Sequence, residues 1–168
     1  MKNMKIFGDF ANRATAGIVV FALLSAITVG YIFSNSLKSQ EESNDKSTNI
    51  TEQIKPILDP EDKIPKKEFN HRIRKTAHCI EFGALGIFLA LLFECIKKRF
   101  NKTDIFAPLM LSLSVAVGDE YIQTFNDRGS QIEDVLIDIC GAVGGIIIVL
   151  LIMFFVKKLK NTRRVMKQ

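Results

Sequence analysis

The chain has 168 residues, of which 48% are hydrophobic, and its formal net charge is +5. This length suits one domain, but the hydrophobic residues are unevenly distributed, in four stretches of roughly 20 residues each. The polar residues that remain are concentrated in one segment and could not cover four such helices. The composition therefore excludes a soluble globular protein, and with it a nucleic-acid reader and a disulfide scaffold.

The four apolar stretches predict an all-α membrane protein, with four transmembrane helices in an antiparallel bundle and a single domain over 1–168. The expected spans are approximately 14–34, 76–96, 105–125 and 135–156. At about 1.5 Å per residue, each is long enough for the hydrocarbon core of a bilayer, about 30 Å thick. The first span exceeds the usual 7–15 or so apolar residues of a cleavable signal peptide, so we expect a retained anchor.

The basic residues predict how these spans are oriented. Segments 1–13, 97–104 and 157–168 hold 13 Lys or Arg against two acidic residues, whereas the loops at 36–75 and 126–134 hold ten basic against eleven acidic. By the positive-inside rule, both termini are expected in the cytoplasm. Attraction to anionic lipids explains the basic segments, so the expected partner is the lipid bilayer and not a nucleic acid.

The polar segment at about 36–75 is expected to be an extracytoplasmic loop. Ser, Asn, Lys, Glu and Gln dominate it as far as Thr51, and prolines punctuate the remainder. Only Ile54, Ile57 and Leu58 have helix-like spacing, so we expect at most a short surface helix. The part at 41–49 lacks apolar residues that could offset the entropy of ordering, and it is expected to be the most mobile part of the chain.

Several polar residues interrupt the apolar stretches. They are His78 and Glu81 in the second span, Asp119, Glu120 and Gln123 in the third, and Asp138 in the fourth. An ionised side chain at mid-bilayer costs on the order of 3 kcal/mol, so such residues face other helices or water. If the N-terminus is inside, Glu81, Asp119, Glu120 and Asp138 all fall roughly 5–9 Å below the outer boundary and form one layer.

Helical spacing supports this layer. Arg74, His78 and Glu81 are spaced i, i+4, i+7, and Lys75 adjoins His78 at i+3, so these side chains follow one stripe of the second span.

The fourth span carries a second stripe, with Asp134, Asp138, Gly141 and Gly145 at i, i+4, i+7 and i+11. This stripe is acidic at its outer end and small below. Small residues at such spacing allow helices to approach closely, so we interpret the glycines as a helix-packing surface.

Four segments together resemble the VanZ-like family. They are Arg-Lys-Thr-Ala-His-Cys-Ile-Glu-Phe-Gly-Ala-Leu-Gly at 74–86, Asp-Glu-Tyr-Ile-Gln-Thr-Phe at 119–125, Arg-Gly-Ser at 128–130, and Asp-Val-Leu-Ile-Asp-Ile-Cys-Gly at 134–141. The family pattern, R-K-x-x-H-x-x-E-[FY]-x-x-L-G, then D-E-x-x-Q, a nearby Arg with Gly and Ser, and D-x-x-x-[DN]-x-x-G, is specific in combination. One departure is Ile122, where many members carry His.

The resemblance implies a small integral membrane protein of the bacterial cytoplasmic membrane, in a family whose named member is linked to low-level teicoplanin resistance. Our leading hypothesis is an outward-facing polar site that binds or modifies a lipid-linked or anionic cell-wall precursor and so affects glycopeptide susceptibility. Guanidinium and ammonium groups suit anionic oxygens, and the remaining residues would orient the ligand or move protons. The expected ligand-binding residues are Arg74, Lys75, His78, Glu81, Asp119, Glu120, Gln123, Arg128, Asp134 and Asp138.

Two alternatives stay open. One is an intramembrane hydrolase or transferase with His78, Glu81, Asp119 and Glu120 as catalytic candidates; a divalent cation could assist it, although the sequence assigns no cofactor and no metal ligand. The other is a structural bundle that acts through partner proteins, in which the buried charges only pair with one another. The sequence assigns no oligomeric state.

Overall fold

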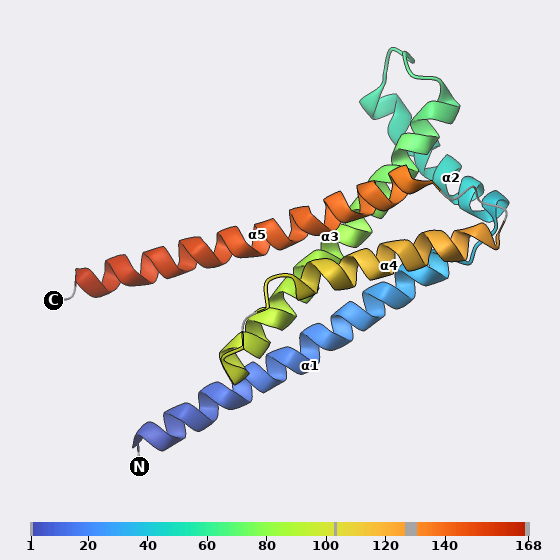
Figure 1. The fold of residues 1–168 in the computed structure, drawn as a ribbon. Helices are drawn as coiled ribbons and strands as arrows, with labels where there is room; N and C mark the ends of the chain where they lie inside the picture. Colours follow the sequence, from blue (N-terminus) through green and yellow to red (C-terminus); the bar gives the residue numbers. More distant parts are fainter. Residues whose placement is uncertain (1, 103, 127–130, 167–168) are drawn as a thin grey trace.

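The protein is helical throughout its regular structure. The computed structural model describes residues 2–102, 104–126 and 131–166, and these residues contain no strand. Their five helices are α1 (Lys2–Ser36), α2 (Gln40–Leu58), α3 (Lys66–Phe100), α4 (Ala107–Thr124) and α5 (Ile132–Val165). Helices α1, α3, α4 and α5 run alternately in opposite directions, so the start of α1 and the end of α5 lie at the same end of the molecule (Figure 1).

Three helices of the described residues are long and apolar enough to cross a membrane. These stretches are Asn12–Ser36, Lys66–Phe100 and Ile132–Arg163. The third expected span, 105–125, corresponds to α4, which is helical but has only 18 residues and does not reach the hydropathy of the others. The reason is that Asp119, Glu120 and Gln123 lie within this one short helix, so its C-terminal turns are polar.

Helix α2 corrects the expectation of a mobile loop. The 19 residues from Gln40 to Leu58 form one helix, which includes the part at 41–49 that we expected to be mobile. A capping box starts it: Glu42 N–H donates to Ser39 Oγ at 3.2 Å, and Ser39 N–H donates to Glu42 Oε2 at 3.2 Å. This reciprocal pair satisfies two of the backbone donors that have no partner inside a helix.

Helix α2 packs on the polar extension of α3 through hydrogen bonds and not through an apolar face. Asn70 Nδ2 donates to Thr48 Oγ1 at 3.2 Å, and Arg74 Nη1 donates to Asn44 Oδ1 at 3.0 Å. Asn44 and Thr48 are spaced i, i+4 on α2, as Asn70 and Arg74 are on α3, so two polar stripes face each other. Phe69 is buried beside them. Hydrophobic periodicity alone could not predict this contact.

Helices α3 and α5 approach each other closely along the predicted small-residue stripe. A Cβ added at Gly141 would lie 2.3 Å from the carbonyl oxygen of Cys79, and one added at Gly145 would lie 2.1 Å from that of Gly83. At Gly86, the same atom would meet the carbonyl oxygen of Ala142 at 2.2 Å. Real Cβ atoms do not approach backbone oxygens so closely, so these glycines allow the backbones to touch.

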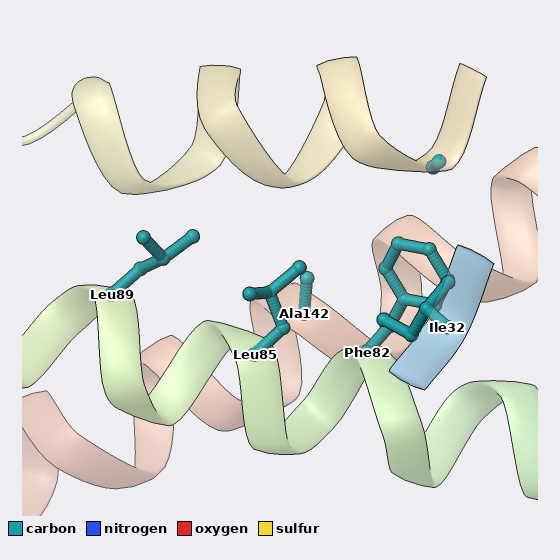
Figure 2. Packing of buried hydrophobic residues seen from close by; sticks show 6 residues of the cluster. Ile32, Phe82, Leu85, Leu89 and Ala142 are labelled. Carbon is teal, nitrogen blue, oxygen red and sulfur yellow. The ribbon is translucent and has the colours of Figure 1, made fainter. Parts of the chain in front are cut away.

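The apolar core lies where four helices meet. It consists of Ile32 on α1, Ala116 on α4, Ala142 on α5, and Phe82, Leu85 and Leu89 on α3. Figure 2 shows Phe82, Leu85 and Leu89 in a row along α3, with Phe82 beside Ile32. This core holds the four helices together.

The outward faces of the long helices are apolar as well. On α1, Val19, Leu23 and Ile27 are exposed, and on α5, Leu151 and Phe155 are exposed. A contiguous apolar surface of this extent is suited to lipid and not to water. The surface therefore agrees with the hydropathy of α1 and α5.

Candidate functional site

Three helices bring one histidine and two aspartates together in a buried cluster. Nδ1 of His78 on α3 lies 3.8 Å from Oδ2 of Asp119 on α4 and 3.7 Å from Oδ1 of Asp138 on α5. The side chain of His78 is 23% exposed, while those of Asp119 and Asp138 are 0% and 1% exposed. The three side chains offer ligand atoms that all lie within 4.8 Å of one another. We call these three residues the His–Asp cluster.

Asp119 is fixed by donors from two helices. The Ser36 hydroxyl, at the end of α1, donates to Oδ1. Gln123 Nε2, one turn further along α4, donates to Oδ2 at 2.8 Å. Both carboxylate oxygens therefore accept a hydrogen bond, as a buried charge requires.

Asp138 has a different environment. Neither of its carboxylate oxygens accepts a hydrogen bond from the described residues, although both are shielded from solvent. The distance of 3.7 Å to His78 Nδ1 is too long for a hydrogen bond. Asp138 is therefore a buried carboxylate whose stabilisation is incomplete within the described part of the chain.

Glu81 and Glu120 lie on either side of the cluster and have their own partners. Glu81 Oε1 accepts a hydrogen bond from Asn35 Nδ2 of α1 at 3.2 Å. Glu120 Oε2 accepts one from the backbone N–H of Gln131, before α5, at 3.1 Å. The H-x-x-E spacing of His78 and Glu81 therefore does not place both side chains in one set of ligand atoms.

A polar cleft of about 590 Å³ opens beside the cluster, between α2, α3 and the ends of α4 and α5. Basic and polar side chains line it, including Lys66, Lys67 and Arg74 of α3 and Asn44 of α2. Gln123, which binds Asp119, also lines it. The cleft therefore has basic side chains in its lining. Gln123 connects it to the buried carboxylate of Asp119.

Lys75 does not line this cleft, and its side chain reaches the start of α5. Its Nζ lies 3.4 Å from Asp134 Oδ1 and 3.8 Å from Glu133 Oε2. The side chain of Glu133 is 78% exposed, so at least part of this contact is screened by solvent. Lys75 therefore offsets the negative charge at the N-terminal end of α5.

The expected site residues thus separate into groups. His78, Asp119 and Asp138 form the cluster, and Gln123 supports it. Arg74 and Asp134 line the cleft, Glu81 and Glu120 flank the cluster, and Lys75 pairs with Asp134. Arg128 lies outside the described residues.

Sequence reasoning assigned no role to Ser36, Asn35 and Asn44, which position Asp119, Glu81 and Arg74. Ser36 and Asn35 end an apolar helix with polar residues, and this change of character is a signal that could have identified them. Asn44 lies in a uniformly polar segment and has no such signal.

The fold and the site together define a helical membrane-type protein with a polar cleft over a buried His–Asp cluster. Comparison with known families then gives a specific assignment. The VanZ/LLP1 family model matches residues 20–154, and the chain belongs to this family. Comparisons with curated proteins and with solved structures gave no match.

Proposed function

We propose that this protein is a multi-pass protein of the bacterial cytoplasmic membrane whose cleft faces outward and binds an anionic lipid-linked or cell-wall precursor. The observation that carries the proposal is the cleft of about 590 Å³, whose wall includes the cationic side chains of Lys67 and Arg74. A cleft with this lining suits a ligand that bears phosphate or carboxylate groups.

The orientation follows from the charges of the helix ends. The start of α1, the end of α5 and the α3–α4 connection lie at one end of the molecule, and α2 lies at the other (Figure 1). The basic segments 1–13, 97–104 and 157–168 belong to the first end, which the positive-inside rule assigns to the cytoplasm. In this arrangement α4 crosses the membrane as a fourth span, shielded by α1, α3 and α5, and both termini are cytoplasmic.

The ligand chemistry follows from Arg74. Its guanidinium lines the cleft and, among the described residues, donates one hydrogen bond to Asn44, so other N–H groups of the guanidinium can donate to a ligand. Guanidinium binds phosphate and carboxylate oxygens in a bidentate manner, and Lys67 adds charge nearby, whereas Lys66 is paired with Glu52 at 2.7 Å. The exposed apolar faces of the bundle lie in the bilayer, where a lipid-linked ligand would keep its chain.

Membership of the VanZ/LLP1 family supports glycopeptide susceptibility, and teicoplanin in particular, as the cellular readout. A protein that binds exposed wall precursors would alter how a glycopeptide reaches them. The proposal therefore joins a binding event, measured on the purified protein, to a phenotype, measured in cells.

The test is Arg74→Gln, with Arg72→Gln as the matched control. Arg72 is exposed on the same helix, pairs with Glu68 at 2.6 Å and does not line the cleft. We expect Arg74→Gln to keep membrane abundance but to lose bound polyprenyl phosphate in native mass spectrometry, and to lose teicoplanin tolerance. The control should retain both.

The structural alternative predicts a different pattern. If the polar layer only braces the helices, removing one partner destabilises the fold, and tolerance follows abundance across all variants. Lipid binding equal in Arg74→Gln and Arg72→Gln, together with tolerance that depends on abundance alone, would overturn the binding proposal.

A further inference from the structure

The His–Asp cluster has the composition and spacing of a metal site. His78, Asp119 and Asp138 come from three different helices, so their convergence is a property of the fold and not of a local turn. Metal–ligand distances of about 2.1 Å put neighbouring ligand atoms about 3–3.5 Å apart. The separations of 3.8 Å and 3.7 Å from His78 Nδ1 exceed this by a few tenths of an ångström, and the three ligand atoms all lie within 4.8 Å of one another, so side-chain rotations would bring them to a shared cation.

The second observation is the environment of Asp138. Its side chain is 1% exposed, and neither oxygen accepts a hydrogen bond from the residues that the structure describes. No lysine or arginine of these residues forms an ion pair with it, since Lys75 contacts Asp134 and Glu133 instead. Buried carboxylates are paired or coordinate metals, so a cation would supply what this carboxylate lacks.

The surroundings of Asp119 have the features of a ligand held by outer contacts. Ser36 and Gln123 each donate a hydrogen bond to one of its oxygens. Metal-ligating carboxylates are hydrogen-bonded in this way, because the outer contacts fix their orientation.

We infer that His78, Asp119 and Asp138 bind one divalent cation at the base of the cleft. One imidazole nitrogen and two carboxylates favour Mn²⁺ or Zn²⁺ over Ca²⁺, which takes six to eight or so oxygen ligands. A cavity of about 20 Å³, lined among others by His78, Glu120 and Asp138, adjoins the cluster. This volume accommodates one water as a further ligand. The metal site is independent of the proposed ligand of the cleft.

The experiment uses the full chain, purified in detergent, stripped with chelator and dialysed against Mn²⁺ or Zn²⁺ in excess Mg²⁺. Bound metal is measured by inductively coupled plasma mass spectrometry. Each substitution has a control on the same helix: His78→Gln beside His71→Gln, and Asp138→Asn beside Glu133→Gln, since Glu133 is 78% exposed. We expect one cation per chain in the parent and in both controls, and at least tenfold weaker binding in His78→Gln and Asp138→Asn.

The parent protein supplies a second measurement that does not depend on the folding of any variant. Electron spin-echo spectroscopy of the Mn²⁺-loaded protein should show coupling to one imidazole nitrogen, which changes on ¹⁵N labelling of histidine. Absence of that coupling, substoichiometric metal, or equal binding in all four variants would identify adventitious surface binding and overturn the inference. If His78→Gln and Asp138→Asn lose bound metal but keep bound polyprenyl phosphate, the proposed function stands independently of the metal site.

Discussion

Ser36 donates a hydrogen bond to Asp119 across 83 residues of sequence, and both side chains are completely buried. Ser36 is the last residue of α1, and Asp119 lies in the penultimate turn of α4. The contact therefore joins the end of the first long helix to the His–Asp cluster. It fixes the depth of α1 relative to α4.

Ser36→Ala should destabilise the bundle by about 1.5–3 kcal/mol, because a buried carboxylate loses the hydroxyl that donates to its Oδ1. Ser34→Ala is the control, since Ser34 is exposed and donates only to the carbonyl oxygen of Tyr31. The measurement is the free energy of unfolding in detergent. Equal stability of the two variants would show that Asp119 does not depend on Ser36.

Gly145→Ala should separate α3 from α5. The added Cβ would lie 2.1 Å from Gly83 O and 3.0 Å from Ile87 N, which are backbone atoms and cannot rotate away. Overpacking of this kind costs about 1–3 kcal/mol or more. Gly144→Ala is a matched control one residue earlier, where nothing lies within 4 Å of the new atom and helix propensity favours Ala by about 1 kcal/mol. Thermal unfolding should rank Gly145→Ala below the parent, and Gly144→Ala at or above it; the opposite order would contradict the packing argument.

The α2–α3 connection should weaken in acid. The N–H of Ile64 donates to Asp59 at 2.9 Å and lowers the pKa of that carboxyl below its ordinary value of 3.8, with Lys55 and the N–H of Lys63 contributing. A depressed pKa stabilises the folded form above pH 3.8, and this contribution is lost as the pH falls toward the lower folded-state pKa.

Limited proteolysis of this connection with pepsin, at pH values between about 5 and 2, measures the effect. Asp59→Asn should remove the dependence. Glu61→Gln should preserve it, because Glu61 is 70% exposed. Identical pH profiles for Asp59→Asn and the parent would show that another group controls the connection.

Membrane topology gives a direct prediction from the charge asymmetry. Reporter fusions after Arg13, Ser47, Thr103, Arg128 and Gln168 should read inside, outside, inside, outside and inside. The fusions after Thr103 and Arg128 decide whether α4 crosses the membrane. If both read on the same side, α4 does not span it, and the cleft does not face outward.

Which residues form long helices was predictable from the sequence. The apolar stretches at 14–34, 76–96 and 135–156 lie within α1, α3 and α5, because hydrophobic length alone distinguishes a spanning helix. The i, i+7, i+11 spacing from Asp134 to Gly145 also predicted the face of α5 that packs on α3, since helical periodicity is a local property.

The helix at 40–58 was not predictable in the same way. Its contacts with α3 are hydrogen bonds between polar side chains, such as the one from Asn70 to Thr48. A hydropathy pattern cannot predict such contacts, because it reports only apolar residues. The expectation of a mobile segment counted only apolar residues as partners and omitted the capping box at Ser39 and Glu42.

The sequence by itself predicted that Glu81, Asp119, Glu120 and Asp138 lie in one layer, because the expected depth follows from counting residues along each helix. Only the tertiary structure decided which of the polar residues share one cluster. Glu81 is three residues from His78 yet contacts Asn35, while Asp138, 60 positions away in the chain, lies beside His78. That choice depends on the rotation of each helix about its axis. The glycine contact of α3 with α5 and the Ser36 contact of α1 with α4 set that rotation, and both are long-range packing events.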